Sequence, residues 1–127
     1  MEIVDLSNST HGGRKSEKSF ISIYKGTDTF HFSKKLSERF EDKSEVVIGF
    51  EDGDIYFSFL ENAHPKGRPL NQKKKGNKVF GSKKAAGLIR DRFNKTRDES
   101  FRMYLDGAIK VSPNNDDFLN FYRFHVE

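Results

Sequence analysis

Residues 45–59 read EVVIGFEDGDIYFSF and contain the clearest structural pattern in the chain. Two sets of alternating apolar residues flank a short acidic segment: Val46, Ile48 and Phe50 on one side, and Ile55, Phe57 and Phe59 on the other. Strict alternation places every second side chain on the same face of a β-strand, and the intervening Glu-Asp-Gly has the composition of a tight turn. The stretch therefore predicts a β-hairpin with one buried face.

Strands and a short helix are predicted before this hairpin. SFISIYKGTDTFHFS, residues 19–33, alternates on both sides of a Lys-Gly-Thr-Asp turn and predicts two strands. The first strand has two faces, one formed by Phe20, Ser22 and Tyr24 and the other by Ile21 and Ile23. Ser33 is typical of a helix N-cap, and Leu36 and Phe40 are four residues apart, as on one face of a helix near residues 33–41.

The second half of the chain repeats this order of elements. Ser82 is a second candidate N-cap, and apolar residues at helical spacing after it predict a helix near residues 82–94. Two later strands are predicted from the alternating sets Phe101, Met103 and Leu105, and Tyr122, Phe124 and Val126. FHFSKK at residues 30–35 corresponds to VFGSKK at residues 79–84. An internal duplication and two unrelated halves with a common tripeptide are both compatible with these patterns.

Together these patterns predict an α+β fold with two helices and about six strands. Two similar strand–helix–hairpin halves, residues 19–61 and 78–127, are expected to share one core in a single domain. The segment at 62–77 contains two prolines, two glycines and little apolar surface, which predicts a mobile basic linker. Residues 1–18 are rich in Ser, Gly and charge and predict a mobile arm.

The net charge of +4 conceals an uneven distribution. Between residues 62 and 90 there are nine basic residues and no Asp or Glu, whereas acidic residues outnumber basic ones in the rest of the chain. A segregated block of this kind favours an anionic partner, and phosphate recognition uses long cationic side chains on accessible backbone. The alternative interpretation is a basic loop that is only solvated.

The candidate nucleic-acid contacts follow from this block and from the two predicted helix starts. Glycines at positions 76 and 81 allow the backbone to approach a ligand, and a helix N-terminus attracts anions. The candidates are Lys73, Lys74, Lys75, Lys78, Ser82, Lys83 and Lys84 in the second half, and Lys34 and Lys35 in the first.

The aromatic residues suggest a further hypothesis. Tyr56, Tyr104 and Phe121, together with Arg102, are predicted to point away from the apolar strand faces. Exposed aromatic rings beside cations are suited to stacking on single-stranded bases. Burial in a core that covers both sheet faces is the alternative for these rings.

FHFSKKLSERFEDKSEVVIGFEDGDIYFSF, residues 30–59, resembles the AbrB/MazE/MraZ-type swapped-hairpin domain. Such domains pair two strand–helix–hairpin units, from two chains or from tandem repeats in one chain. The second half of this chain is similar in element order only. Where the family has Gly-Arg and then Pro before the helix, this sequence has Thr27-Asp28-Thr29 and Phe32-Ser33. The resemblance implies a bacterial transcription regulator or antitoxin that binds DNA.

Several function classes are disfavoured. The chain has no cysteine, and its four histidines lack the spacing of metal ligands, so we expect no metal and no other cofactor. It contains no nucleophile elbow and no phosphate-binding glycine loop, and we do not expect an enzyme. There is no signal-peptide pattern and no long apolar stretch, which predicts a cytoplasmic protein without a membrane partner.

The sequence therefore predicts a non-enzymatic nucleic-acid-binding protein, a small DNA-binding regulator or accessory factor that uses the lysine-rich loop and a helix N-terminus. The alternative is a protein-interaction module or inhibitor, for example from a phage or mobile element, whose basic loop docks on an acidic partner surface. The sequence is compatible with a monomer and with a homodimer.

Overall fold

The computed structural model describes residues 18–72, 76–114 and 117–127, and it describes side chains in these ranges except at 107–118. Within them lie the helices α2 (Lys34–Arg39) and α3 (Lys83–Arg92). The strands are β1 (Phe20–Ile23), β2 (Thr29–Phe32), β3 (Glu45–Glu51), β4 (Asp54–Leu60), β5 (Arg68–Pro69), β6 (Asn71–Gln72), β7 (Lys78–Gly81), β8 (Phe101–Asn114) and β9 (Asp117–Val126). They form one antiparallel sheet in the order β5-β3-β4-β9-β8-β1-β2-β7-β6.

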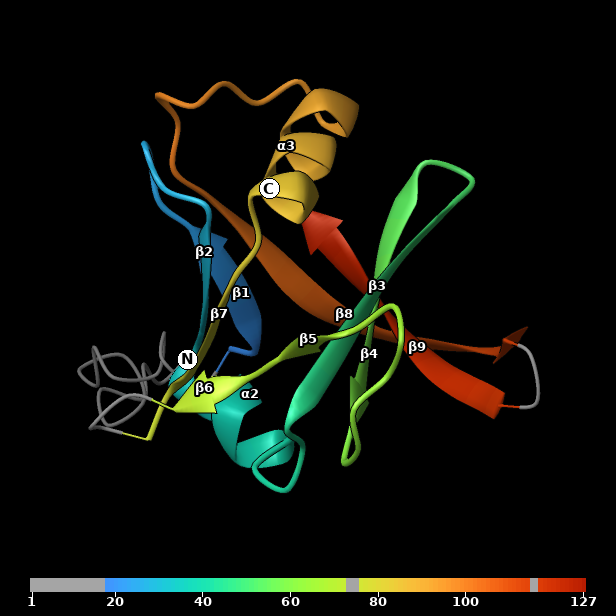
Figure 1. Cartoon of the computed structure of the whole chain (residues 1–127). Helices are drawn as coiled ribbons and strands as arrows, with labels where there is room; N and C mark the ends of the chain where they lie inside the picture. The colour runs from blue at the N-terminus through green and yellow to red at the C-terminus, as the bar shows by residue number, and fades with distance from the viewer. Residues whose placement is uncertain (1–17, 73–75, 115–116) are drawn as a thin grey trace, which may run out of the picture.

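The sheet curls into a near-barrel because its two outer strands are neighbours in the sequence (Figure 1). Only Leu70 separates β5, which pairs with β3, from β6, which pairs with β7. The Leu70 N–H donates to the Ser44 carbonyl at 2.8 Å, and its side chain packs against the core. The segment 68–72 thus brings the first and last strands of the sheet together.

The predicted α+β fold with about six strands is therefore wrong, since the protein is mostly sheet with nine strands. The predicted linker at 62–77 contributes β5 and β6 in its described part. These two-residue strands are exposed and are held by backbone pairing to distant strands. Because they lack alternating apolar residues, the sequence pattern does not reveal them. The predicted arm lies outside the described residues except for Lys18.

The predicted hairpin and helices are confirmed in position. Val46 pairs with Phe59, and Asp52 and Gly53 turn the chain with φ values of 51° and 83°. Two successive positive φ values are typical of the tight turns that join antiparallel strands, and glycine adopts them without a steric penalty. The α2 and α3 helices begin after the N-caps Ser33 and Ser82, as the sequence predicts.

The two halves of the chain are interleaved in the sheet. In each half a strand, a helix and a hairpin follow in order: β2-α2-β3-β4 and β7-α3-β8-β9. Each hairpin pairs with strands of the other half, since β4 pairs with β9 and β8 pairs with β1. The β2 and β7 strands also pair with each other. Neither half therefore has its full set of strand partners without the other.

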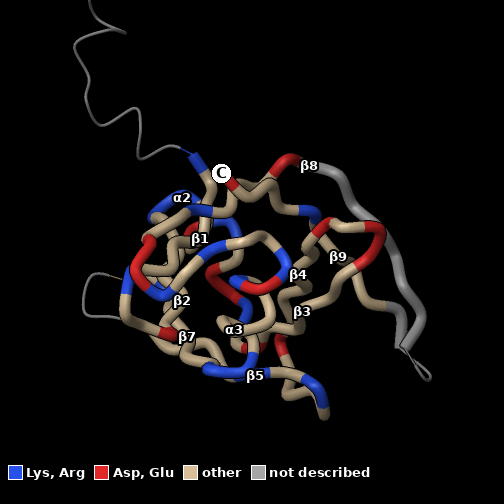
Figure 2. The backbone as a smooth tube through the Cα atoms, turned by 90° about the horizontal axis from the view of Figure 1, so that it is seen from above, with Lys and Arg blue, Asp and Glu red and all other residues tan. Residues whose placement is uncertain are grey.

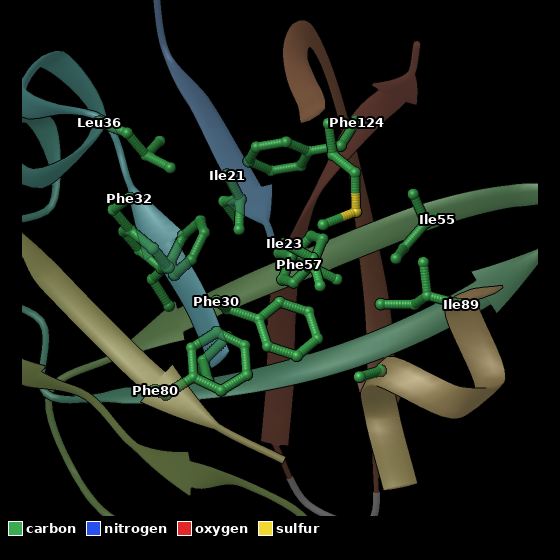
Figure 3. Close-up of a cluster of buried hydrophobic side chains, with 14 of the residues drawn as sticks. Ile21, Ile23, Phe30, Phe32, Leu36, Ile55, Phe57, Phe80, Ile89 and Phe124 are labelled. Carbon is green, nitrogen blue, oxygen red and sulfur yellow. The ribbon is translucent and has the colours of Figure 1, made fainter. Parts of the chain in front are cut away.

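The core lies inside the near-barrel and consists mainly of Phe and Ile side chains (Figure 3). Phe30 of β2 and Phe80 of β7 stack with ring centroids 4.3 Å apart, and each is at most 1% exposed. Leu36 of α2 and Ile89 of α3 are fully buried on different sides of this cluster. The two helices thus cover opposite ends of the near-barrel (Figure 1).

Candidate nucleic-acid interface

Aromatic and cationic side chains lie next to one another on the outer face of β1 and β8. The inner face of these two paired strands is buried through Ile21, Ile23, Phe101 and Met103. The alternate residues therefore point outward, and the register places Phe20 opposite Tyr104 and Ser22 opposite Arg102. We call the set Lys18, Phe20, Tyr24, His31, Arg102 and Tyr104 the aromatic–basic surface.

Contacts within this surface hold the cations against the rings. The Phe20 and Tyr104 ring centroids are 5.5 Å apart, and the Arg102 guanidinium carbon lies 4.4 Å from the Phe20 centroid. Arg102 Nη1 donates a hydrogen bond of 3.4 Å to Tyr104 Oη, and Lys18 Nζ lies 5.7 Å from the Tyr104 centroid. These are cation–π distances, at which an ion is attracted to the face of the ring.

Arg102 carries a positive charge beside the aromatic rings. The hydrogen bond to Tyr104 raises the pKa of Arg102 above its usual value, with smaller electrostatic contributions from Tyr104, Tyr24 and Glu127, and partial burial opposes the rise. Like every arginine guanidinium, that of Arg102 is protonated at physiological pH. Arg102 therefore presents a fixed positive charge and a flat stacking plane on the same face as the aromatic rings.

A cleft of about 400 Å³ adjoins the aromatic–basic surface along β1 and β2. Its lining includes Phe20, Tyr24 and His31 of that surface, and also Lys34 and Asn77. The Tyr24 and His31 rings are 5.0 Å apart, and Tyr24 is 49% exposed although it is a large aromatic residue. We call this the β1–β2 cleft; its volume lies in the range of small-molecule sites, and it combines flat rings with an exposed ammonium group.

A buried hydroxyl also lines the β1–β2 cleft. Ser22 is 2% exposed, and its Oγ has no hydrogen-bond partner among the described residues. Buried hydroxyl groups usually have such a partner, and the Ser22 hydroxyl beneath the cleft lining has none among the described residues. The cleft thus combines rings that can stack with a base, an unpaired hydroxyl at its lining and a cation suited to phosphate.

Only some of the sequence-predicted contacts lie at this cleft. Lys34 lines it, and Lys35 is the next exposed residue of α2. Lys73, Lys74 and Lys75 lie outside the described residues. In the sequence they come immediately before Gly76 and Asn77, and Asn77 lines the cleft.

Lys78 has a structural position. It is 6% exposed, its Nζ donates to the Lys43 carbonyl at 2.8 Å, and its backbone N–H donates to Ser37 Oγ at 3.0 Å. These bonds fasten the start of β7 to α2 and to the loop after it. Because the ammonium group already has a partly buried partner, we do not include Lys78 in the interface.

The remaining predicted contacts lie elsewhere. Ser82 caps α3 by accepting the Ala85 N–H at 3.1 Å, and Lys83 and Lys84 are exposed in the first turn of α3. Ser82 and Lys84 line a separate cleft between β3 and α3. Figure 2 shows basic positions at α2, at α3 and at β5 rather than in one block. Among the described candidates, Lys34 thus lies at one cleft, and Ser82 and Lys84 lie at another.

The outward aromatic residues of β4 and β9 differ from those of β1 and β8. The Phe121 ring lies so close over Gly49 that a Cβ atom at Gly49 would be 3.2 Å from it. Tyr56 is also half-buried, and Arg123, its partner in the register, donates to Asp106 at 2.6 Å. The bond to Asp106 is the main cause of a raised pKa at Arg123. The cation here is therefore neutralised, whereas Arg102 faces rings.

The alternating pattern predicts that Arg102 and Tyr104 point outward, but it does not predict the rest of the aromatic–basic surface. It places Phe20, Ser22 and Tyr24 on one face of β1, yet alternation alone does not show which face points outward. The exposed position of Tyr24 and its contact with His31 depend on the pairing of β1 with β2. A polar residue at position 22 between two aromatic residues is the local signal that favours an outward face.

Other features bear on the class of protein. In the described part of the chain, no three or more His, Asp or Glu side chains are grouped as metal ligands would be. None of the described helices has the length and apolar character needed to cross a membrane. Comparison with known protein families, characterised proteins and solved structures finds no match to this chain. The functional class must therefore be inferred from the surface itself.

Proposed function

We propose that the protein is a non-enzymatic nucleic-acid-binding protein that holds single-stranded DNA or RNA on the aromatic–basic surface. The observation that carries the proposal is the contact of the exposed Tyr24 with the half-buried His31, beside Phe20, Tyr104 and Arg102 on one outward sheet face. Every nucleobase has a flat π-face, and stacking on an aromatic ring contributes about 1–3 kcal/mol per base. Cysteine-free composition suits a reducing cytoplasm, where we place the protein.

The β1–β2 cleft supplies the accompanying polar contacts. A base stacked on Tyr24 would direct its edge toward Ser22 and Asn77, which carry hydrogen-bonding groups. Lys18 and Lys34 lie at this surface and cleft and are suited to the phosphate backbone. The three lysines at 73–75 precede Asn77 in the sequence, and we propose that they extend this phosphate contact.

Fluorescence anisotropy with a labelled single-stranded oligonucleotide, titrated at several salt concentrations, tests the proposal. We expect Tyr24→Ala to weaken binding about tenfold, because it removes one stacking ring. Leu88→Ala is a matched control, since Leu88 is equally exposed, at 49%, but lies on α3 and not on the aromatic–basic surface. Equal affinities for the two variants, or no binding at low salt, would refute the proposal.

A second pair of variants distinguishes the effect of a cation on the aromatic–basic surface from the effect of net charge. Arg102→Gln removes a cation that lies against Phe20, and Arg123→Gln removes one that is already paired with Asp106. Both changes lower the net charge by one. We expect only Arg102→Gln to weaken single-strand binding, and equal effects would show that overall charge alone controls affinity.

Duplex DNA is a second candidate ligand, because each hairpin of this chain pairs with strands of the other half. The resemblance to swapped-hairpin regulators implies such a paired arrangement and a DNA-binding regulatory role. Under this alternative the exposed Lys83 and Lys84 at the start of α3 contact phosphates. A duplex that binds more tightly than its single strands, and that loses affinity on Lys83→Ala with Lys84→Ala, would favour the alternative.

A further inference from the structure

A second surface feature is a groove between β3 and α3, here called the β3–α3 groove. It has a volume of about 310 Å³. Its apolar part comes from Val46, Ile48 and Phe50 of β3 and from Phe80, Ala85 and Leu88. Leu88 is 49% exposed and is one of two large hydrophobic residues that are exposed among the described residues. An apolar groove with an exposed leucine is a typical protein contact site.

The rim of the β3–α3 groove is basic. Lys66, Arg68 and Lys84 line it and are exposed, and none of the described residues that line it is acidic. Near the far end of β3, the Arg92 guanidinium carbon lies 4.3 Å from the Phe50 ring centroid and extends the positive charge. A ligand of this groove must therefore combine apolar groups with negative charge.

Part of β3 has a strand partner on one side only. β5 pairs only with Glu45 and Val46, and the described residues of β3 beyond them pair with β4 alone. An edge strand of this kind presents unpaired N–H and C=O groups to any extended segment that lies beside it. Ile48 and Phe50 are on this edge, and both line the groove.

From these observations we propose that the β3–α3 groove binds an extended segment of a partner protein in which apolar and acidic residues alternate. The apolar side chains of the segment contact Ile48, Phe50 and Leu88, and its carboxylates reach Lys84 and the basic residues at positions 66 and 68. Alternation fits an extended chain because successive side chains point in opposite directions. The groove shares no lining residue with the β1–β2 cleft, so both ligands can be bound together.

A labelled short peptide of alternating Leu and Asp is the probe for this groove, with a Leu–Lys peptide and a Ser–Asp peptide as controls. We expect the Leu–Asp peptide alone to bind and to shift the amide NMR signals of Ile48 and Phe50. Leu88→Asp and Lys84→Glu should each weaken binding at least tenfold. Lys35→Glu makes the same charge change at an exposed site on α2 and should leave binding unchanged.

Distinct outcomes would overturn the proposal. They are absence of Leu–Asp binding, equal binding of the Leu–Lys peptide, and insensitivity to both groove variants while circular dichroism shows an intact fold. If an oligonucleotide displaces the peptide equally well from the wild-type protein and from Tyr24→Ala, the groove binds phosphate instead. Self-association that is abolished by Leu88→Asp would assign it to a second copy of this chain.

Discussion

Replacing Ser33 with Ala tests the connection between α2 and β1. Ser33 Oγ accepts the Leu36 N–H at 3.3 Å and the Phe20 N–H at 3.1 Å, and it donates to the Lys18 carbonyl at 2.9 Å. Loss of an N-cap costs about 0.5–2 kcal/mol, and a buried donor left without a partner costs about 1–3 kcal/mol. Since Phe20 N is only partly buried, we expect the free energy of unfolding to fall by about 2–3 kcal/mol in total.

Ser82→Ala is the matched control at the start of α3. Ser82 Oγ accepts the Ala85 N–H at 3.1 Å, and Ser82 is more exposed than Ser33. The expected loss is therefore that of a cap alone, about 1 kcal/mol. Urea denaturation followed by circular dichroism measures both values. Equal losses, with equal dependence on urea, would refute the inference that Ser33 joins the helix to β1 as well as capping it.

Three further predictions concern stability. Asp28→Asn should lower the free energy of unfolding by about 2 kcal/mol in thermal or urea denaturation, because Asp28 accepts a 3.0 Å bond from the buried Arg90, and an unchanged midpoint would contradict this. Lys78→Ala should lower the free energy of unfolding by about 1–2 kcal/mol, because it removes a hydrogen bond to a partly buried carbonyl. The salt dependence of oligonucleotide binding should stay unchanged, and a flatter dependence would show that Lys78 contacts phosphate. Gly87→Ala, in open space on α3, should raise the free energy of unfolding by about 0.5–1 kcal/mol, whereas Gly53→Ala, at φ 83°, should lower it by about 1 kcal/mol. Changes of the same sign would contradict the inference that backbone conformation determines both effects.

The parts of the fold that the sequence predicts are those with a local cause. The hairpin at 45–60 is visible because alternation and a turn lie within one short stretch, and each helix has its own N-cap. The β5 and β6 strands depend on pairing with residues far away in the sequence, as when Arg68 pairs with Val46. The interleaving of the halves is equally non-local, so a count of local patterns underestimates the sheet.

The candidate site also has parts with a local cause, which the sequence predicts, and parts that depend on distant strand pairing. Alternation correctly predicts that Arg102 and Tyr104 point outward, since Phe101 and Met103 between and beside them are buried. It does not bring Tyr24 to His31, because that contact requires the pairing of β1 with β2. Charge clustering in the sequence also treats all lysines alike. Lys78 is buried in the structure, where its ammonium group donates a hydrogen bond to the Lys43 carbonyl and its backbone N–H donates one to the Ser37 hydroxyl.

Photo-crosslinking tests the central claim most directly. A single-stranded oligonucleotide that carries halogenated uracil reacts with aromatic rings on which its base is stacked, and mass spectrometry identifies the modified residues. The proposed function predicts crosslinks at Tyr24, Phe20 and Tyr104, with little modification of other aromatic residues. Crosslinks confined to Tyr56 and Phe121, or no crosslink at an oligonucleotide concentration that saturates binding, would contradict it.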